Sequence, residues 1–510
     1  MKLRHILPVA ALFVAASAPA QQINPITKAV LRGYEQTLKE NPKDFETLYQ
    51  RSAQYYNLSM YDNALTDISR AIEYTPAKES SMLQMEYSLL ADICIELKEY
   101  GKALDAVNKV LEMSPDSYAD LYKKGNIQLH LKDAEGAYRS FSSMQRLKSR
   151  SQEAYFGMAS ACVLMDRKAE AEELLNEARN ADPSSAITYC RLGDLYRQMG
   201  DNHQAAANYL SAFALADNTD RPLQSLINLG ETDFTSVSEA IDYALSRSDN
   251  QVPLLFLKGN ISNLTGNFNE AYASLTNLLK VPEARQPSVY AALAESCLAL
   301  NKIDEARGNA DRSLELNQNA DNMLLKARIS RAEGKPAEAV AVLDRLLAKD
   351  GGNVDALVCS ALANVDLGNN EKALQQLNEA VISNASDPLP LMVRAWLNAT
   401  VLNNQKSAVA DRNRVASMPV EGFPGVAYKA LAKALNGKKM DGDAIVEEAL
   451  AASPTKTDLY HAAVYYAQSG NLEKAVEMRD KARSLGFSNI YLLESDRTAN
   501  LNLLPIAHLK

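Results

Sequence analysis

The 510-residue sequence is poor in tryptophan and glycine and has no excess of basic charge. It holds one Trp and 10 Phe beside 23 Tyr. With 47% hydrophobic residues, 23% charged residues and only 21 Gly and 18 Pro, it can bury a core, which argues against a collagen-like fibre and against a disordered chain. Its formal charge of -9 disfavours a protein that works by neutralising phosphates, so no nucleic-acid partner is expected. At this length the chain is either several globular units or one elongated array of repeats.

Long apolar runs are also scarce, and the one near the start predicts export. Lys2 and Arg4 precede an apolar stretch over residues 6–16, and residues 18–20 read Ala-Pro-Ala, a form that signal peptidases accept. The stretch is well short of the roughly 20 residues that span a bilayer, which favours cleavage over a membrane anchor. We expect residues 1–20 to be a signal peptide and no transmembrane segment to remain after cleavage. The mature protein is then exported: periplasmic, outer-membrane-associated or secreted.

Residues with typical catalytic or metal-binding spacing are likewise missing. The five cysteines are odd in number and far apart, which favours small core residues over disulfides or metal ligands. The sequence has no phosphate-binding Gly-rich loop, nucleophile elbow, metalloprotease His pair or EF-hand loop. The histidines beyond residue 20 are widely separated. We therefore predict no catalytic residue, no metal site, no cofactor and no enzymatic activity.

What the chain does contain is a repeat with a period clustered on 34 residues. It is marked by a column of alanines: Ala64, Ala103, Ala137, Ala171, Ala205, Ala240, Ala271, Ala306, Ala339, Ala373, Ala408, Ala444 and Ala475. Twelve positions earlier stands a second column of small residues: Ser52, Ala91, Gly125, Ala159, Gly193, Gly259, Ala294, Ala327, Ala361, Ala432 and Ala463. Large residues lie four before and three after the second column, as do Tyr189 and Tyr196 around Gly193, which is one helical face.

Each copy therefore predicts two amphipathic helices of about 13 residues that approach closely at their small residues. Prolines follow the second helix in several copies, for example Pro115 and Pro183, where they cannot continue a helix. Glycines such as Gly200 fall in the turn between the two helices. Two copies depart from the pattern. The copy around Ala240 is shortened, and Trp396 stands where the copy around Ala408 needs a small residue, so we expect a kink or altered packing at both.

Residues 186–219 show the pattern best, and they resemble the tetratricopeptide repeat (TPR) family. Its signature positions hold Tyr189, Leu192, Gly193, Tyr196, Ala205, Tyr209 and Ala212, while Asp217 replaces the terminal proline. The resemblance covers nearly all of residues 45–490. It implies an all-α fold, a right-handed α-solenoid of about thirteen tetratricopeptide-type helix pairs.

The departures from the repeat divide the chain into seven parts. They are a signal peptide (1–20), an N-terminal capping helix (21–44), an N-terminal array (45–219), a degenerate short repeat (220–251), a central array (252–387), a divergent C-terminal array (388–484) and a C-terminal cap (485–510). Terminal caps are expected of a solenoid because its end repeats lack one neighbour.

The resemblance also implies where a ligand binds. In this family the first helices line an inner groove, with contacts near the second, fifth, ninth and twelfth residues of each copy. Carried onto this sequence, that gives Tyr49, Tyr56, Tyr122, Asn126, Phe156, Arg197, Phe256, Asn260, Arg328 and Tyr460. Asparagines can hold a peptide backbone and aromatic rings supply contact area. The same residues are equally compatible with packing against neighbouring helices.

Two functions follow from these observations. The first is a non-enzymatic exported scaffold that binds a protein or peptide along the concave groove, in envelope assembly. The alternative is a carbohydrate-binding module of a nutrient-uptake or cell-wall system, in which Tyr and Phe faces stack on a glycan. The lysines with which some family members clamp a C-terminal carboxylate are not matched here.

Overall fold

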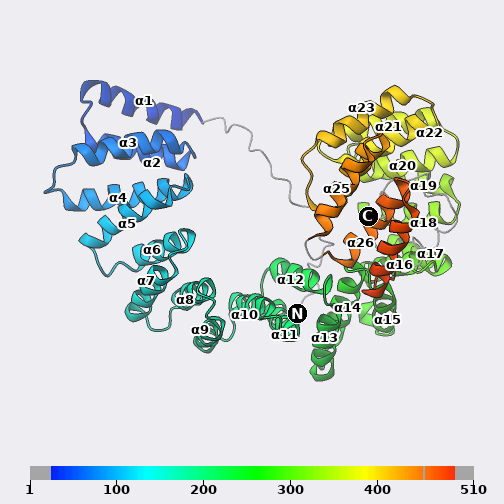
Figure 1. Ribbon diagram of the computed structural model, residues 1–510, viewed down its shortest axis with the longest axis horizontal. Coiled ribbons are helices and arrows are strands. Elements are labelled where there is room, and N and C mark those ends of the chain that lie inside the picture. Colours follow the sequence, from blue (N-terminus) through cyan, green and yellow to red (C-terminus); the bar gives the residue numbers. More distant parts are fainter. Residues whose placement is uncertain (1–23, 452–453, 489–510) are drawn as a thin grey trace. The chain divides into compact units, whose positions relative to one another are not determined.

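The computed structural model describes residues 24–451 and 454–488, and these form 27 α-helices with one short 3-10 turn and no strand (Figure 1). The expected signal peptide and residues 489–510 of the expected C-terminal cap lie outside the described residues. The chain divides into two compact units between Thr219 and Asp220. We call them unit 1 and unit 2.

Unit 1 consists of a single helix followed by five helix pairs. The elements are α1 (Pro25–Glu40), α2 (Phe45–Asn57), α3 (Tyr61–Tyr74), α4 (Ser80–Glu96), α5 (Tyr100–Met113), α6 (Tyr118–His130), α7 (Ala134–Leu147), α8 (Gln152–Leu164), α9 (Lys168–Ala181), α10 (Ala186–Met199) and α11 (Asn202–Leu215). In Figure 1 the first helices α6, α8 and α10 lie on the inner side of the curve of unit 1, and α7, α9 and α11 lie on its outer side.

Unit 2 contains eight pairs. They are α12 (Asp220–Gly230), α13 (Phe234–Arg247), α14 (Val252–Leu264), α15 (Phe268–Leu278), α16 (Pro287–Ala299), α17 (Ile303–Leu316), α18 (Ala320–Ala332), α19 (Pro336–Leu347), α20 (Val354–Asp366), α21 (Asn370–Ser383), α22 (Pro388–Thr400), α23 (Gln405–Ser417), α24 (Gly422–Leu435), α25 (Lys439–Leu450), α26 (Lys456–Gln468) and α27 (Leu472–Ser484). The described residues thus confirm the solenoid of thirteen helix pairs preceded by one helix.

The small residues allow the two helices of a pair to cross at short range. Gly193 of α10 faces Tyr209 of α11, and a Cβ at Gly193 would lie 2.5 Å from the tyrosine ring. Gly125 and Gly157 face the ring of Phe141 in the same way. Because each of these rings fills the space of a missing side chain, the pairs interlock as the sequence predicts.

The alanine column is wrong in two copies. The small residue is the fourth residue of the second helix, as Ala205 is in α11. In α13 that position is Val237, which is fully buried, while Ala240 is half-buried. In α25 it is Gly442, while Ala444 is exposed. The spacing of alanines gave the wrong residue in these two copies because Val237 and Gly442 occupy the helix crossing.

Trp396 does not stand in the helix crossing. Ala395, one residue earlier, is the buried small residue of α22, and the connection to α23 is one residue longer than in most other copies. The expected departure around residue 240 is present, because α12 has only 11 residues and contacts α13 less extensively than other partners contact each other.

The turn between the two helices supports the corrected alignment. Five residues before the small residue, the backbone is left-handed in twelve pairs: at Ser59, Lys98, Lys132, Asp166, Gly200, Gly266, Asn301, Gly334, Gly368, Asn403, Gly437 and Gly470. The α12–α13 pair is the exception. A left-handed residue lets the chain reverse within a short loop, so this position is geometrically fixed even where no glycine occupies it.

The cysteines are core residues, as their place in the repeat indicates. All five are buried and none forms a disulfide: Cys94, Cys162, Cys190, Cys297 and Cys359. Burial raises the pKa of Cys162 to about 11 and that of Cys297 to about 12. These thiols are therefore packing groups in the resting structure.

Unit 2 closes on itself. Figure 1 shows α26 returning toward the first helices of this unit, and hydrogen bonds join the start of α26 to the end of α12. Ser488, which follows α27, bonds Gly266 in the turn between α14 and α15. The contacts join residues more than 200 positions apart in the chain.

Candidate ligand-binding surfaces

The first helices of unit 1 expose a set of large apolar side chains, which we call the unit 1 wall. It consists of Met85, Tyr122, Leu164 and Ile187, whose side chains are 48%, 44%, 50% and 54% exposed. They come from α4, α6, α8 and α10, and occupy the second, fifth or thirteenth position of their copies. Positions two and thirteen are three helical turns apart and share one face. Exposed apolar groups on successive inner helices provide contact points for an extended chain.

Polar contacts join the first helices that carry these apolar side chains. Lys123 of α6 pairs with Asp92 of α4 at 2.6 Å, and Tyr118 donates to Glu153 of α8 at 3.1 Å. Each contact crosses from one first helix to the next. The wall therefore presents one apolar site on each of four successive first helices, and polar contacts join neighbouring helices.

The sequence-predicted residues of unit 1 differ in accessibility. Tyr122 and Arg197 are exposed, and Tyr49 and Tyr56 are half-buried. Asn126 is half-buried and donates its amide N–H to the carbonyl of Tyr122 at 2.9 Å.

Phe156 is a correction to the predicted site. It is only 9% exposed, and the guanidinium of Arg191 lies 4.6 Å from its ring centroid. Arg191 comes from the next first helix, α10, so the ring is covered by a neighbouring repeat. Spacing could not reveal this because it does not show what lies across the repeat boundary.

In unit 2 two predicted aromatic residues are also core residues. Phe256 is 3% exposed and Tyr460 is 1% exposed, so neither presents a ring to a ligand in this structure. Asn260 and Arg328 are half-buried, and Asn260 donates to the carbonyl of Phe256 at 2.9 Å. The predicted set is thus divided between the two units.

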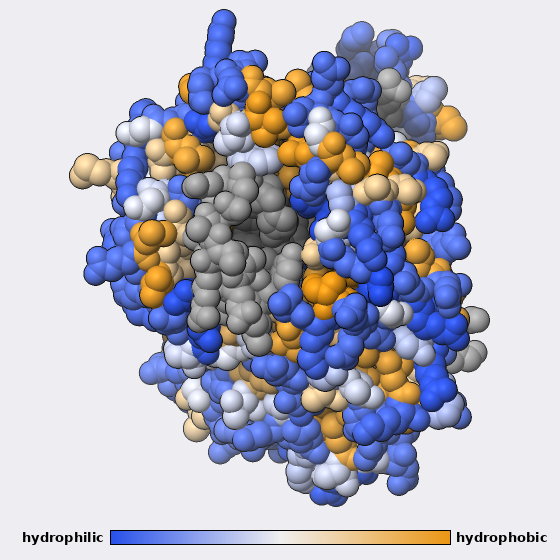
Figure 2. Space-filling view, turned by 90° about the vertical axis from the view of Figure 1, so that its right-hand side faces the viewer, coloured by the Kyte–Doolittle hydropathy of each residue, from blue (hydrophilic) through white to orange (hydrophobic). Residues whose placement is uncertain are grey.

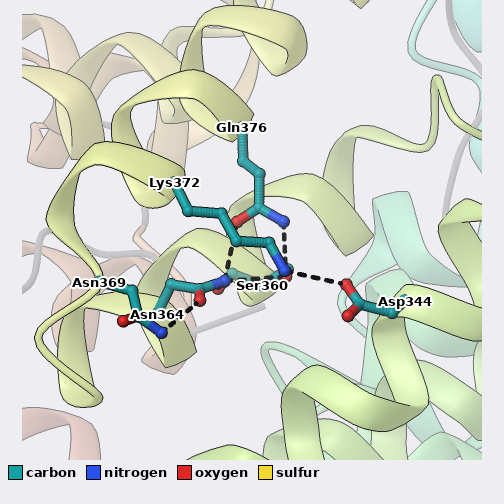
Figure 3. A network of polar contacts seen from close by, with 6 residues as sticks. All are labelled: Asp344, Ser360, Asn364, Asn369, Lys372 and Gln376. Atoms are coloured by element: carbon teal, nitrogen blue, oxygen red, sulfur yellow. Dashed lines mark hydrogen bonds and ion pairs between the residues drawn. The ribbon is translucent and has the colours of Figure 1, made fainter.

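Buried polar networks inside helix pairs are structural. In α20–α21, Asn364 donates to Gln376 at 3.1 Å and Gln376 donates to Ser360 at 2.8 Å (Figure 3). Asn369 donates to Asn364 at 3.2 Å, and Lys372 reaches Asp344 of α19 at 3.5 Å. These groups satisfy one another, so the network fixes the pair rather than offering donors to a ligand.

The contact that closes unit 2 joins two helix ends. The ammonium of Lys456, at the start of α26, donates to the carbonyl of Gly230, the last residue of α12, at 3.4 Å. Thr457 donates to the carboxylate of Glu231 at 2.9 Å. A cation thus lies at a helix C-terminus and an anion at a helix N-terminus, and both placements are favoured by the helix dipoles. We call this contact the α12–α26 clasp.

Burial disfavours both charges of the clasp, that of fully buried Lys456 and that of half-buried Glu231. Lys456 is 1% exposed, and burial lowers its pKa to about 8 while Glu231 opposes the shift. Burial also raises the pKa of Glu231, against the hydrogen bond from Thr457 and the charge of Lys456. Each ion therefore depends on the other and on its hydrogen bonds.

A second contact places an aromatic side chain of the C-terminal segment among residues of the α14–α15 turn, α15 and α26. Phe487 stacks on Tyr460 with ring centroids 4.6 Å apart, and it meets Phe268 edge-on at 6.3 Å. Its ring also covers Gly266. We call Gly266, Phe268 and Tyr460 the Phe487 pocket.

The surface outside these contacts carries scattered apolar groups. The face in Figure 2 is largely hydrophilic, with apolar residues in small groups between polar ones. Ile382 and Met440 are highly exposed examples. Within residues 24–451 and 454–488, no helix is both long and apolar enough to cross a bilayer, and no cluster of His, Cys, Asp and Glu could hold a metal ion.

Comparison with known proteins agrees with the helix-pair architecture. Sequence profiles of the tetratricopeptide repeat match residues 87–117, 186–219, 291–354 and 330–397. This chain contains tetratricopeptide repeats. A TPR repeat-containing protein of Methanocaldococcus jannaschii is 29% identical over 265 residues, which cover 49% of this chain and 40% of the relative. The chain spans less than half the length of that curated relative.

Among solved TPR structures, yeast Tom70 is 18% identical, with a TM-score of 0.39 and coverage of 87% of this chain and 96% of that one. The Cut9–Hcn1 hetero-tetramer of the APC/C is 14% identical, with a TM-score of 0.32 and coverage of 90% and 98%. At these identities and TM-scores the likenesses say nothing about ligand or partner.

Proposed function

We propose that this TPR protein is a non-enzymatic scaffold whose unit 1 wall binds an extended segment of a partner protein. The single observation that carries the proposal is the row of exposed Met85, Tyr122, Leu164 and Ile187 on successive first helices. Repeat arrays hold extended ligands through many weak contacts spread over neighbouring units. A peptide with apolar side chains at intervals fits this row, while its backbone meets the polar groups between them.

The polar links across the wall support this choice of ligand. The Lys123–Asp92 pair and the Tyr118–Glu153 hydrogen bond keep adjacent first helices at fixed spacing. A wall held in one geometry loses less conformational entropy on binding than a mobile one. The spacing of the apolar sites then selects among partner sequences.

A carbohydrate ligand finds less support. Sugar stacking needs exposed aromatic faces, and of the sequence-predicted aromatic residues Phe156, Phe256 and Tyr460 are buried. Among all the sequence-predicted aromatic residues, Tyr122 is the one that is exposed. We therefore favour a protein ligand and propose no second function.

The binding proposal is tested by partner capture with altered wall residues. The full chain without residues 1–20 is crosslinked in an envelope extract, and captured proteins are identified by mass spectrometry. Tyr122→Ala combined with Ile187→Ser should reduce capture of a specific partner at least about tenfold, as loss of central contacts does at interfaces. The matched control is Tyr243→Ala with Leu215→Ser, which changes exposed residues of the second helices α13 and α11. Equal capture by both double variants would refute the proposal.

Export and a role in envelope assembly are further parts of the proposal. They rest on the charged, apolar and small-residue regions of residues 1–20. The N-terminal sequence of the protein recovered from cell-envelope fractions should begin at Gln21. Recovery of the intact N-terminus from the cytoplasm alone would contradict export.

A further inference from the structure

The side chain of Phe487 is enclosed by aromatic residues of other helices, as the side chain of a bound peptide would be. It is 7% exposed, stacks on Tyr460 with an interplanar angle of 19°, and meets the edge of Phe268 at 82°. Offset stacking and edge-to-face contacts are the preferred geometries of aromatic pairs. The ring is therefore recognised from two sides by aromatic residues that come from other helices of unit 2.

The floor of the pocket requires glycine. Gly266 has a φ of +72°, and a Cβ at this position would lie 2.6 Å from Cδ2 of Phe487. A side chain at residue 266 would thus occupy the space that the phenyl ring fills. The close approach of ring to backbone makes the pocket a fitted cavity for one aromatic group.

The next residue is bound through its backbone and hydroxyl. The amide N–H of Ser488 donates to the carbonyl of Gly266 at 3.0 Å, and its hydroxyl donates to the same oxygen at 3.2 Å. The amide of Asn269 donates to the Ser488 hydroxyl at 3.4 Å. An anchored side chain followed by main-chain hydrogen bonds is the general way in which a protein recognises a short extended peptide.

The pocket also uses a position that the family assigns to ligands. Tyr460 is the fifth residue of its copy, where the resemblance implies a ligand contact on the first helix. In this structure Phe487 covers it. Tyr460, which is a ligand contact only by the family resemblance, is thus in contact with the chain's own aromatic residue.

We propose that the Phe487 pocket is a peptide-docking site that the chain occupies with its own Phe487–Ser488 segment, and that it accepts from a partner an aromatic residue followed by serine. The segment follows α27 and is not part of a helix. It is held by the ring contacts of Phe487 and the hydrogen bonds of Ser488, so it can be released without unfolding a helix pair. Release of Phe487 then exposes the pocket to a competing chain. This inference concerns unit 2 and does not depend on binding by the unit 1 wall.

The test is direct binding of a peptide to a chain whose own segment has been altered. A labelled peptide Arg-Ser-Leu-Gly-Phe-Ser-Asn-Ile, the sequence of residues 483–490, is titrated by fluorescence anisotropy against the full chain without residues 1–20. The Phe487→Ala variant should bind it at least about tenfold more tightly than the unaltered chain, because the internal competitor is removed. A peptide with Ala in place of its Phe should not bind.

Two further variants locate the binding and protect the test against misfolding. Gly266→Ala added to Phe487→Ala should abolish binding, whereas Gly308→Ala added to Phe487→Ala should leave it unchanged, since Gly308 has open space around its Cα. Phe487→Leu keeps an apolar side chain in the pocket, so this variant should bind the peptide with an affinity between those of the unaltered chain and Phe487→Ala. Circular dichroism confirms that each variant is folded.

Two outcomes would overturn the inference. One is equal affinity of the peptide for the unaltered chain and for Phe487→Ala. The other is absence of binding to folded Phe487→Ala and Phe487→Leu. Because only unit 2 residues and their matching peptide are varied, either result leaves the proposal for unit 1 standing.

Discussion

At the scale of single residues, the inter-helix turn shows what glycine spacing reveals and what it misses. The sequence indicates the turn where Gly200 or Gly368 stands, and both have left-handed backbone. Lys98, Lys132 and Asn301 adopt the same conformation without being glycines, with φ between 57° and 60°. The loop geometry imposes this conformation, and a side chain with a Cβ bears the strain.

Replacing such a residue by glycine should therefore stabilise the protein. We expect Lys98→Gly to raise the free energy of unfolding by about 1 kcal/mol, because the strain of the left-handed lysine exceeds the entropy cost of glycine. Lys102→Gly, within the neighbouring helix α5, should instead lower it by about 1 kcal/mol. Urea unfolding followed by circular dichroism measures both. A destabilised Lys98→Gly would contradict the strain.

His461 is a residue whose effect depends on pH. It is 5% exposed, neither ring nitrogen has a hydrogen-bond partner among the described residues, and burial lowers its pKa to about 4. The unfolded chain has the ordinary pKa of 6.5 and so binds the proton first as pH falls. Stability is full above pH 6.5 and decreases toward pH 4, by about 3 kcal/mol in all.

This acid sensitivity is measurable by thermal unfolding. His461→Leu should flatten the fall in melting temperature between pH 6.5 and pH 4. His130→Gln should leave that fall unchanged, because His130 is exposed and stacks on Tyr100. Identical pH profiles for His461→Leu and the unaltered chain would show that His461 does not cause the dependence.

At the scale of elements, each helix pair is set by one small residue facing one large one. Gly193 and Tyr209 illustrate it, since Tyr209 is fully buried and its hydroxyl donates to Asp194 at 2.8 Å. That bond fixes the ring against the glycine, so the ring cannot easily move aside. Burial, together with Asp194, raises the pKa of Tyr209 well above its usual value, which keeps the hydroxyl protonated as the donor.

A methyl group at this crossing should separate the two helices. We expect Gly193→Ala to cost about 1 to 3 kcal/mol of stability by overpacking, and Gly193→Leu to cost more. Gly308→Ala is the matched control, because Gly308 lies in α17 with nothing near its Cα, and there alanine should stabilise by about 1 kcal/mol. Unchanged denaturant midpoints for both Gly193 variants would mean that the crossing is not tightly packed.

At the scale of the molecule, the clasp turns the linear array of unit 2 into a closed one. In an open solenoid, each pair contacts only its neighbours and the ends unfold first. In unit 2 the last pair also contacts the first pair through Lys456 and Thr457, and Phe487, which follows the last pair, contacts Phe268 of the second pair. The two ends of this unit should therefore unfold together.

Breaking the clasp should uncouple these ends. Lys456→Met removes the ammonium and leaves the Glu231 carboxylate without its counter-charge, at a cost of about 3 kcal/mol. Glu231→Gln added to Lys456→Met should recover most of that loss. Hydrogen exchange should show faster exchange in α26 and α12 for the single variant only. Lys474→Met, which breaks the more exposed pair with Glu447, should change exchange little.

The sequence predicts the fold far better than the sites. Helix pairs follow from the recurrence of small and large residues, and thirteen copies correct one another, so a misplaced Ala240 or Ala444 does not alter the architecture. The exposure of a side chain differs from copy to copy, so the other copies cannot correct a wrong prediction of it. Phe156 and Tyr460 occupy the same repeat position as exposed Tyr122, yet Arg191 covers one and Phe487 the other.

The sequence by itself determined the helices, their pairing and the order of the copies, because these depend on contacts within one repeat or between neighbours in the chain. Only the tertiary structure decided which first-helix residues are exposed and that unit 2 closes through Gly230, Gly266 and Phe487. Closure joins residues more than 200 positions apart, and it depends on curvature accumulated over eight pairs. No local pattern of side chains specifies the accumulated curvature, so the closure can be seen only in the assembled structure.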